Sequence, residues 1–229
     1  MIIRRKKYVF SRGVAFYPEK EMELLRVMAK QGWHLKRMNG LGFLEFVQGD
    51  CEDQRFSVDF FTGSKAELDD YLAIYQEAGW TYVANFKEKY FYFKADPCTP
   101  AIYSDEESYS QRMREEWRWN FFSSLVYLPV GLVLYYVAYL TKQPEVGHTF
   151  LYILSRILLF ITATFFTVMP ISIFINVLFS KIFYKDRKKF FSRPEVFAKR
   201  QRLWRDMIAL MIIGGLFGIL LSILLGDII

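Results

Sequence analysis

The sequence predicts an α+β domain in the N-terminal half of the chain and an all-α membrane region in the C-terminal half. Three observations lead to this fold class. Long apolar segments follow residue 118, cations are concentrated in one of the connections between those segments, and residues 18–46 recur in residues 65–93. Aromatic residues make up 19% of the chain, an excess that suits sheets and membrane interfaces.

Three segments have the length of roughly 20 apolar residues that a helix needs to span a bilayer. They cover residues 119–140, 157–180 and 207–225. A soluble core helix would explain any one of them, but three in succession favour a membrane region of three transmembrane helices.

The distribution of cations predicts how these helices are oriented. The connection 181–205 holds ten Lys and Arg residues, whereas the connection 141–155 holds only Lys142. Because cytoplasmic loops carry the excess of cations, we expect a multi-pass plasma-membrane protein with its N-terminus in the cytoplasm and its C-terminus outside. The net charge of +6 arises beside the apolar segments, so it indicates contact with anionic lipid headgroups rather than with nucleic acid.

The basic loop, residues 181–205, has an internal period. Phe183, Phe190, Phe197 and Trp204 recur every seven residues with cations between them, and Pro194 interrupts the run. This pattern favours amphipathic helices in the headgroup plane; the alternative is a charged loop whose Phe side chains pack on the soluble domain. The cations expected to face lipid are Lys185, Arg187, Lys188, Lys189, Lys199, Arg200, Arg202 and Arg205.

The third apolar segment carries small residues four positions apart, at Gly214, Gly218, Ser222 and Gly226. Such a stripe lets another helix approach closely. We expect it to pack against another span of the same chain, with a homodimer or a membrane-protein partner as the alternative. Arg156, at the outer end of the second segment, is expected to extend toward the membrane interface.

The N-terminal half reads as a tandem repeat with an offset of 47 residues. Each unit predicts a strand, a helix and two aromatic strands. The expected ranges are 8–10, 18–31, 33–38 and 43–47 in the first unit, and 56–61, 64–78, 80–86 and 90–94 in the second. Two such βαββ units predict an antiparallel sheet with two helices on one face. The other face could be a second packing surface, a ligand cleft between the repeats or a partner site.

Both predicted helices end in a Gly-Trp pair. Gly32 and Gly79 suit the left-handed position after a helix, and the following Trp33 and Trp80 should fold back on the last turn. We therefore interpret these four residues as a structural motif. Ser64 and Glu67 fit a capping box at the start of the second helix.

The chain is thus expected to divide into a cytoplasmic domain, residues 1–95, a linker and juxtamembrane helix, residues 96–118, and the membrane region, residues 119–229. The linker assignment rests on Pro97, Pro100 and an acidic stretch.

No sequence motif for catalysis or cofactor binding is present, and we expect no enzyme activity, no metal and no cofactor. Cys51 and Cys98 form no ligand pattern. His34 is expected at the surface. Glu45 and Asp59 are expected to face solvent or to pair with Lys36 or Arg55, although burial could raise their pKa.

Residues 28–35, with the sequence MAKQGWHL, resemble the opening motif of a bacterial family of unknown function, DUF2812. Residues 78–83, AGWTYV, are similar to its second motif. The resemblance covers about residues 4–95. It implies C-terminal transmembrane helices and a Gram-positive source, and it brings no activity or catalytic residue.

The function expected from these features is a membrane-anchored, non-enzymatic regulatory or sensory module. Its cytoplasmic domain would bind a small amphipathic ligand or a protein partner. The alternative is an accessory subunit of a transporter or another membrane complex.

Overall fold

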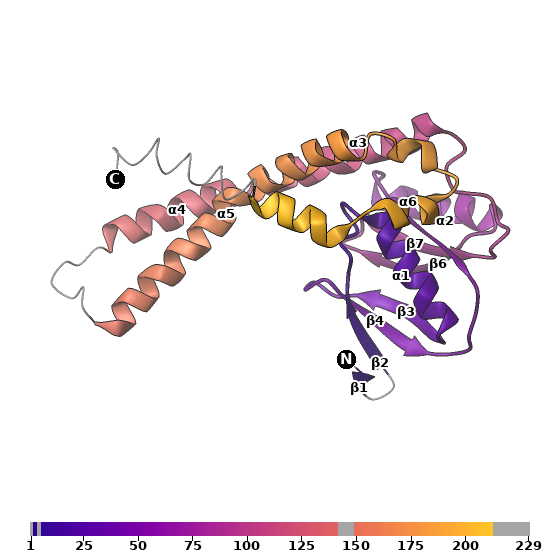
Figure 1. Ribbon diagram of the computed structural model, residues 1–229, viewed down its shortest axis with the longest axis horizontal. Helices are drawn as coiled ribbons and strands as arrows, with labels where there is room; N and C mark the ends of the chain where they lie inside the picture. Colours follow the sequence, from indigo (N-terminus) through magenta and orange to yellow (C-terminus); the bar gives the residue numbers. More distant parts are fainter. Residues whose placement is uncertain (1, 4–5, 142–148, 213–229) are drawn as a thin grey trace. The chain divides into compact units, whose positions relative to one another are not determined.

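A computed structural model describes the chain except residues 1, 4–5, 142–148 and 213–229. The chain forms two compact units. One contains residues 1–116 and 184–203, and the other contains residues 117–183 and 204–229 (Figure 1).

The first sheet of the N-terminal unit is antiparallel, with the strand order β1-β2-β4-β3. Its strands are β1 (Ile2–Ile3), β2 (Lys6–Phe10), β3 (Trp33–Met38) and β4 (Phe43–Gln48). Helix α1 (Pro18–Lys30) connects β2 to β3 and starts at the predicted residue, where proline suits the first turn.

The second sheet is also antiparallel, with the order β5-β7-β6. Its strands are β5 (Arg55–Phe60), β6 (Thr81–Phe86) and β7 (Tyr90–Ala95). Between β5 and β6 lie the short 3-10 helix η1 (Lys65–Glu67) and helix α2 (Leu68–Glu77). The predicted capping box is present, with the Ser64 N–H donating to Glu67 Oε2 at 2.6 Å.

The prediction of a single sheet was wrong. The edge strands β3 and β6 come close to each other, but they belong to separate sheets. Each has a register shift, between Leu35 and Arg37 in β3 and between Tyr82 and Ala84 in β6. A bulge bends a strand and interrupts its ladder, which favours an end to each sheet at these strands.

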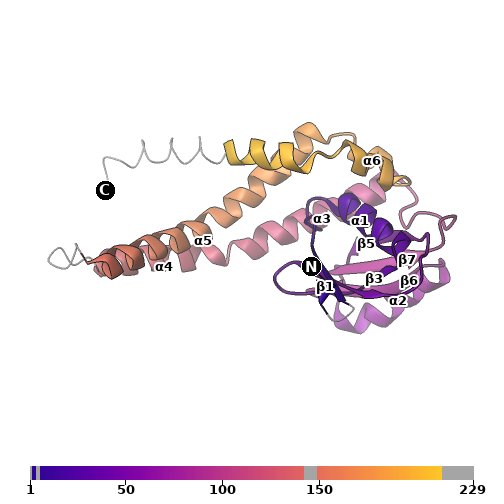
Figure 2. The ribbon, with the colours of Figure 1, turned by 60° about the horizontal axis from the view of Figure 1, so that its bottom comes forward.

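Helices α1 and α2 lie on opposite faces of the second sheet rather than on one face (Figure 2). Successive residues of a strand point to opposite faces. Phe91 and Phe93 of β7 belong to an apolar cluster against which α2 packs, whereas the hydroxyl of Tyr92 faces Glu21 of α1. β7 is therefore buried on both sides and offers no open face for a ligand.

Both helices are followed by the predicted left-handed glycine, and Trp80 folds back on the last turn of α2 as expected. Gly32 has φ +73° and Gly79 has φ +84°, the left-handed conformation that glycine adopts readily. The Trp80 N–H donates to the Tyr75 carbonyl at 2.9 Å, and Trp80 is buried with Tyr75 packed in the same cluster. Trp33 is only half-buried, with the Lys7 ammonium 5.5 Å from its ring centre.

The compact domain does not end at residue 95. Residues 96–116 and 184–203 belong to the same unit, because Tyr109 and other side chains of the expected linker are buried in it. Helix α3 (Glu106–Ser124) begins in this unit. The residues 184–203 contain the 3-10 helix η3 (Arg187–Phe190) and helix α6 (Pro194–Arg200).

The second unit consists of helices among its described residues. They are the end of α3, helix α4 (Tyr127–Leu140), helix α5 (Phe150–Phe183) and the helical residues 204–212. Residues Glu106–Leu140 and Phe150–Phe183 are long and apolar enough to cross a membrane. Most of the third predicted span lies outside the described residues, together with Gly214, Gly218, Ser222 and Gly226.

Helices α4 and α5 pack closely. A Cβ atom on Gly131 would lie 3.0 Å from the Ala163 carbonyl oxygen, so the position favours glycine. The hydroxyls of Tyr135 and Thr164 are 2.6 Å apart across the same pair of helices. Arg156 donates to the Ala138 carbonyl near the end of α4, so its guanidinium satisfies the backbone of a neighbouring helix.

Candidate functional site

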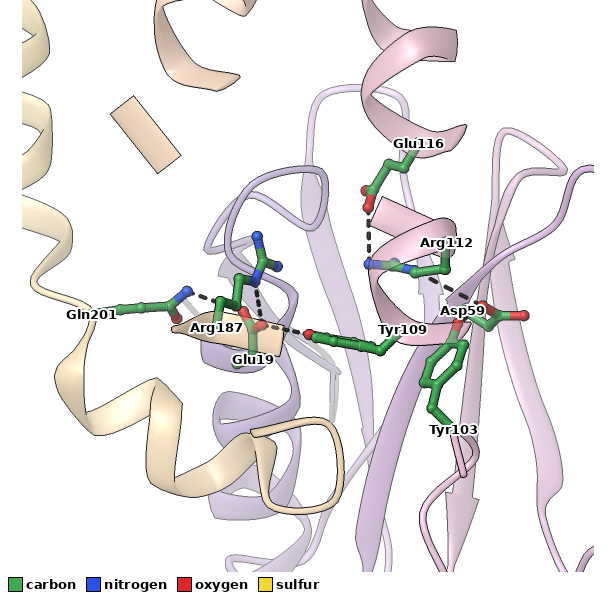
Figure 3. Close-up of polar contacts among 8 residues, drawn as sticks. All are labelled: Glu19, Asp59, Tyr103, Tyr109, Arg112, Glu116, Arg187 and Gln201. Carbon is green, nitrogen blue, oxygen red and sulfur yellow. Dashed lines mark hydrogen bonds and ion pairs between the residues drawn. The ribbon is translucent and has the colours of Figure 1, made fainter. Parts of the chain in front are cut away.

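The N-terminal unit contains a buried carboxylate that joins four segments of the chain. Glu19, in the first turn of α1, is 1% exposed. It accepts hydrogen bonds from Tyr109 Oη at 2.6 Å, Arg187 Nε at 2.5 Å and Gln201 Nε2 at 3.0 Å (Figure 3). These donors come from α3, from η3 and from the residue that follows α6. We call these four residues the Glu19 cluster.

The Glu19 carboxylate is held in its charged form. Burial by itself would raise its pKa, but the charge of Arg187 and the hydrogen bonds from Arg187 and Tyr109 lower the pKa below its ordinary value. Arg187 is 3% exposed, so both charges are buried and each depends on the other. Removing one partner of such a pair leaves an uncompensated buried charge, which costs about 3–5 kcal/mol.

A second buried carboxylate, Asp59 of β5, lies in the same unit. It accepts hydrogen bonds from Tyr71 at 2.7 Å and Tyr75 at 2.6 Å, both on α2, and from Tyr103. Burial and the Asp59 charge raise the pKa of Tyr71 and Tyr75 above the ordinary range. The three phenols therefore stay protonated and act as donors.

Helix α3 connects this carboxylate to a further one. The Arg112 guanidinium lies 3.9 Å from Asp59 and 2.9 Å from Glu116, and Arg112 and Glu116 are both buried. Tyr109, Arg112 and Glu116 are three and four positions apart, so they share one face of α3. Figure 3 shows this face beside the Glu19 cluster.

Glu21, two residues after Glu19, has neutral partners. It accepts hydrogen bonds from Ser11 Oγ at 2.9 Å and from the Arg12 N–H at 2.7 Å, with Tyr92 Oη at 3.5 Å. Burial raises the pKa of Glu21 above its ordinary value. The first turn of α1 thus carries two buried carboxyl groups whose pKa values are displaced in opposite directions.

Residues 184–203 pack on the domain through their apolar side. Helix α6 lies against α1, and Phe197 is 2% exposed, with its ring centre 5.6 Å from those of Phe190 and Tyr184. Arg55 of β5 donates to the Ser192 carbonyl at 2.6 Å. The sequence left two interpretations of this loop: helices in the headgroup plane, or Phe side chains packed on the domain. For Phe197 the second interpretation is correct.

The expectation that Arg187 faces lipid was wrong, because its guanidinium is buried against Glu19. The other cations of that set are exposed, and a role for them at the membrane surface stays a prediction. They are Lys185, Lys188, Lys189, Lys199, Arg200, Arg202 and Arg205.

A cleft of about 400 Å³ lies between α1 and α6. We call it the α1–α6 cleft. Arg55 and Phe56 of β5 and Pro97 line it as well. Its charged side chains are the cations Arg26, Lys30, Arg55 and Lys199 and the carboxylates Glu23 and Glu195.

Glu45 and His34 lie apart from the Glu19 cluster. Glu45 is buried and pairs with Lys6 at 2.8 Å and Arg37 at 2.7 Å, rather than with Lys36 or Arg55. The hydrogen bonds from these two cations lower the pKa of Glu45 to about 2. His34 Nε2 lies 2.8 Å from the Asp50 carbonyl oxygen. Among the described residues, no group of His, Cys, Asp and Glu is arranged to hold a metal ion.

Little in the sequence indicates the Glu19 cluster. Glu19 is an acid in the first turn of a predicted helix, where acids are common, and Arg187 is one of ten cations in the basic loop. The spacing of Tyr109, Arg112 and Glu116 on one helical face was the signal that could have shown that the start of α3 packs on the domain.

These features define a class of protein: an α+β domain with a charged, buried interior, in a chain that also has helices apolar enough to span a membrane. Residues 17–125 match the model of the family described as a protein of unknown function, DUF2812. This match confirms the resemblance to DUF2812 that the Gly-Trp motifs carry. The match includes the start of α3 and therefore extends beyond the expected limit at residue 95. Searches of curated proteins and of solved structures gave no match.

Proposed function

We propose that the chain is a membrane-anchored, non-enzymatic sensory or regulatory module. In this proposal the N-terminal unit binds a ligand or a protein partner, and docking of residues 184–203 conveys occupancy to the apolar helices. The observation that carries the proposal is the buried ion pair between Glu19 and Arg187. It ties the domain to a segment that directly follows α5 in the chain.

The chemistry of this pair supports a switch rather than a permanent joint. Undocking returns both charges to water, and the recovered hydration offsets much of the attraction between them, so the docked and undocked states of the loop can lie close in free energy. A ligand shifts such an equilibrium only through its differential affinity for the two states. A site lined by both α1 and α6 provides that difference.

We also infer that the domain arose by duplication of a βαββ unit. In both sheets the strand order is first, third and second along the chain, apart from the additional β1. The register shifts, at 35/37 and 82/84, and the positive-φ glycines, at 32 and 79, each repeat at the offset of 47 residues. Shared irregularities support duplication more strongly than shared regular strands, because bulges are specific features of a sheet.

For the membrane region we propose three spans, with the N-terminus and the basic loop in the cytoplasm. The cation asymmetry between the two connections supports this orientation. The exposed loop cations would then lie near anionic headgroups.

The test measures tryptic cleavage of the basic loop in inside-out membrane vesicles with and without cytosolic extract from the native host. A sensory module should be cleaved after Lys188 and Lys189 at different rates in the two preparations. The Arg187→Met variant, which lacks the ion pair, should be cleaved at one fast rate in both. Lys185→Gln, at an exposed position of the same segment, is the matched control and should behave like the wild type.

Equal cleavage rates for the wild type with and without extract would contradict a sensory role. The double variant Glu19→Gln/Arg187→Met distinguishes loss of the ion pair from general unfolding, because it removes both charges and leaves no unpaired charge buried. It should restore part of the protection that Arg187→Met loses.

The second candidate is an accessory subunit of a transporter or another membrane complex. The small-residue stripe from Gly214 to Gly226 favours it, because such a stripe suits close helix packing. Purification from the native host in mild detergent discriminates the two. A stoichiometric membrane partner supports the subunit, and a chain that purifies without one argues against it.

A further inference from the structure

The α1–α6 cleft has an excess of cations that the domain itself does not neutralise. Arg26 and Lys30 share one partner, Asp53, at 3.1 and 2.9 Å. Among the described residues, no carboxylate lies within ion-pair distance of Arg55 or Lys199. Both therefore keep their charge available to an anion.

The cations of the cleft come both from the domain and from residues 184–203, the loop that docks on it. Arg55 belongs to β5, and its two terminal nitrogens donate to the Thr99 carbonyl at 2.7 Å and the Ser192 carbonyl at 2.6 Å. These bonds fix the guanidinium without neutralising its charge. Lys199 belongs to α6 and is exposed. An anion held by these two side chains would connect the domain to the loop.

The rest of the wall is largely apolar. Met22 and Val27 of α1 and Phe56 of β5 line the cleft, with Pro97 and Pro194. Val27 is 44% exposed, so it offers apolar surface that a ligand could cover. The volume of about 400 Å³ falls in the range of about 300–1,000 Å³ that is typical of small-molecule sites.

Of the two cleft carboxylates, Glu23 pairs with Lys20 at 3.3 Å. Glu195 lies in the first turn of α6. Four cations against two carboxylates leave the cleft positively charged. A positively charged wall next to an apolar wall favours a ligand with an anionic group and an apolar body.

We propose that the α1–α6 cleft binds an amphipathic anion, a molecule with a carboxylate or phosphate group on an apolar body. The anionic group contacts Arg55 and Lys199, and the apolar body covers Met22, Val27 and Phe56. This inference rests on the proposed sensory function, for which it names the class of ligand. Bound there, the anion stabilises the docked loop, because the two cations belong to the domain and to the loop.

The experiment uses the full chain in nanodiscs of neutral phosphatidylcholine and measures binding by isothermal titration calorimetry. The probes are 4-phenylbutyrate and hexyl phosphate. Two comparators each lack one of these properties. The neutral 4-phenylbutanamide has no anionic group, and inorganic phosphate has no apolar body. The two amphipathic anions should bind measurably more tightly than either comparator.

Two variants place the site. Lys199→Gln should weaken binding about fivefold, as expected for loss of one exposed charge contact, whereas Lys185→Gln, in the same loop but away from the cleft, should leave the affinity unchanged. Val27→Trp should abolish binding by filling the cleft, and its exposed position should preserve the fold. The matched control is Val196→Trp, an exposed residue of α6 that does not line the cleft.

The proposal is overturned if neither anion binds at millimolar concentration, if the amide or inorganic phosphate binds equally well, or if Val27→Trp binds like the wild type. Repeating the titration in nanodiscs with phosphatidylglycerol identifies the source of the anion. Competition by that lipid indicates a bilayer headgroup, and an unchanged affinity indicates a free amphiphile. Binding that leaves tryptic cleavage of the loop unchanged would refute the sensory function while the site itself stands.

Discussion

At the scale of single residues, the first turn of α1 shows how partners decide the charge of a buried carboxyl group. Glu19 and Glu21 are both at most 1% exposed. Glu19 has a buried guanidinium beside it and a lowered pKa, whereas Glu21 accepts hydrogen bonds from neutral groups and has a raised pKa. The two residues therefore respond to pH in opposite senses.

Replacing Glu21 by Gln should make the stability of the protein less dependent on pH. The folded state holds the Glu21 proton more tightly than the unfolded chain does, so the free energy of unfolding falls as pH rises from about 4.5 through the folded pKa. Each pH unit in that window is worth about 1.4 kcal/mol. Thermal unfolding followed by tryptophan fluorescence should show the melting temperature of Glu21→Gln gaining on the wild type as pH rises.

Glu23→Gln is the control for that experiment, because Glu23 is only partly buried and pairs with Lys20 on the surface. Its melting temperature should follow the wild type across the same range. A constant difference between Glu21→Gln and the wild type at every pH would show that Glu21 ionises normally in the folded protein.

How far these residues could be predicted depends on how local their signals are. The predicted helix 18–31 places Glu19 in a first turn, a position that favours acids. Its partner Arg187 is 168 residues away, and no short-range pattern links two such positions. Asp59 falls in the predicted strand 56–61, which its aromatic neighbours mark locally, but the three tyrosines that surround it come from α2 and from the expected linker.

At the scale of elements, the two helix ends with glycine should tolerate substitution differently. Both glycines have positive φ, where a residue with a Cβ loses about 1–2 kcal/mol. A Cβ on Gly32 would also lie 2.7 Å from the Gly49 carbonyl oxygen, whereas on Gly79 the nearest atom, of Thr99, would be 3.5 Å away. Gly32→Ala should therefore lower the melting temperature more than Gly79→Ala does.

Gly40→Ala serves as the reference for these two variants, since no atom lies within 4 Å of the position that its Cβ would take. It should leave the melting temperature nearly unchanged. Equal losses for Gly32→Ala and Gly79→Ala would mean that the contact with Gly49 relaxes at no cost.

Packing of α6 on the domain should depend on one aromatic side chain. Phe197 is 2% exposed, and truncation of a buried Phe to Ala typically costs about 3–5 kcal/mol. Phe197→Ala should speed tryptic cleavage after Lys188 and Lys189. Val196→Ala, at the neighbouring position that is 41% exposed, should cleave like the wild type, and equal rates for both variants would contradict docking through Phe197.

Elements were more predictable than their assembly. β3 has the bounds that the sequence predicted, and α1 starts at the predicted residue, because turn glycines, prolines and aromatic strands mark such limits locally. The separation into two sheets was not predicted, and the aromatic pattern of β3 and β6 does not mark the bulges that these two edge strands contain. The period of Phe residues in the basic loop indicated an apolar face, but whether lipid or protein covers that face depends on segments far away in the sequence.

At the scale of the whole molecule, the proposed topology can be tested with the two natural cysteines. Cys51 and Cys98 are free and exposed in the N-terminal unit. If that unit is cytoplasmic, a membrane-impermeant maleimide should label them only after the cells are permeabilised.

In the Cys51→Ser/Cys98→Ser background, Gln143→Cys should be labelled in intact cells, because the connection that contains Lys142 is expected outside. Lys185→Cys, in the basic loop, should require permeabilisation. Labelling of Gln143→Cys and Lys185→Cys from the same side would refute the orientation, and it would also remove the route by which a docked loop conveys a cytoplasmic signal to the membrane.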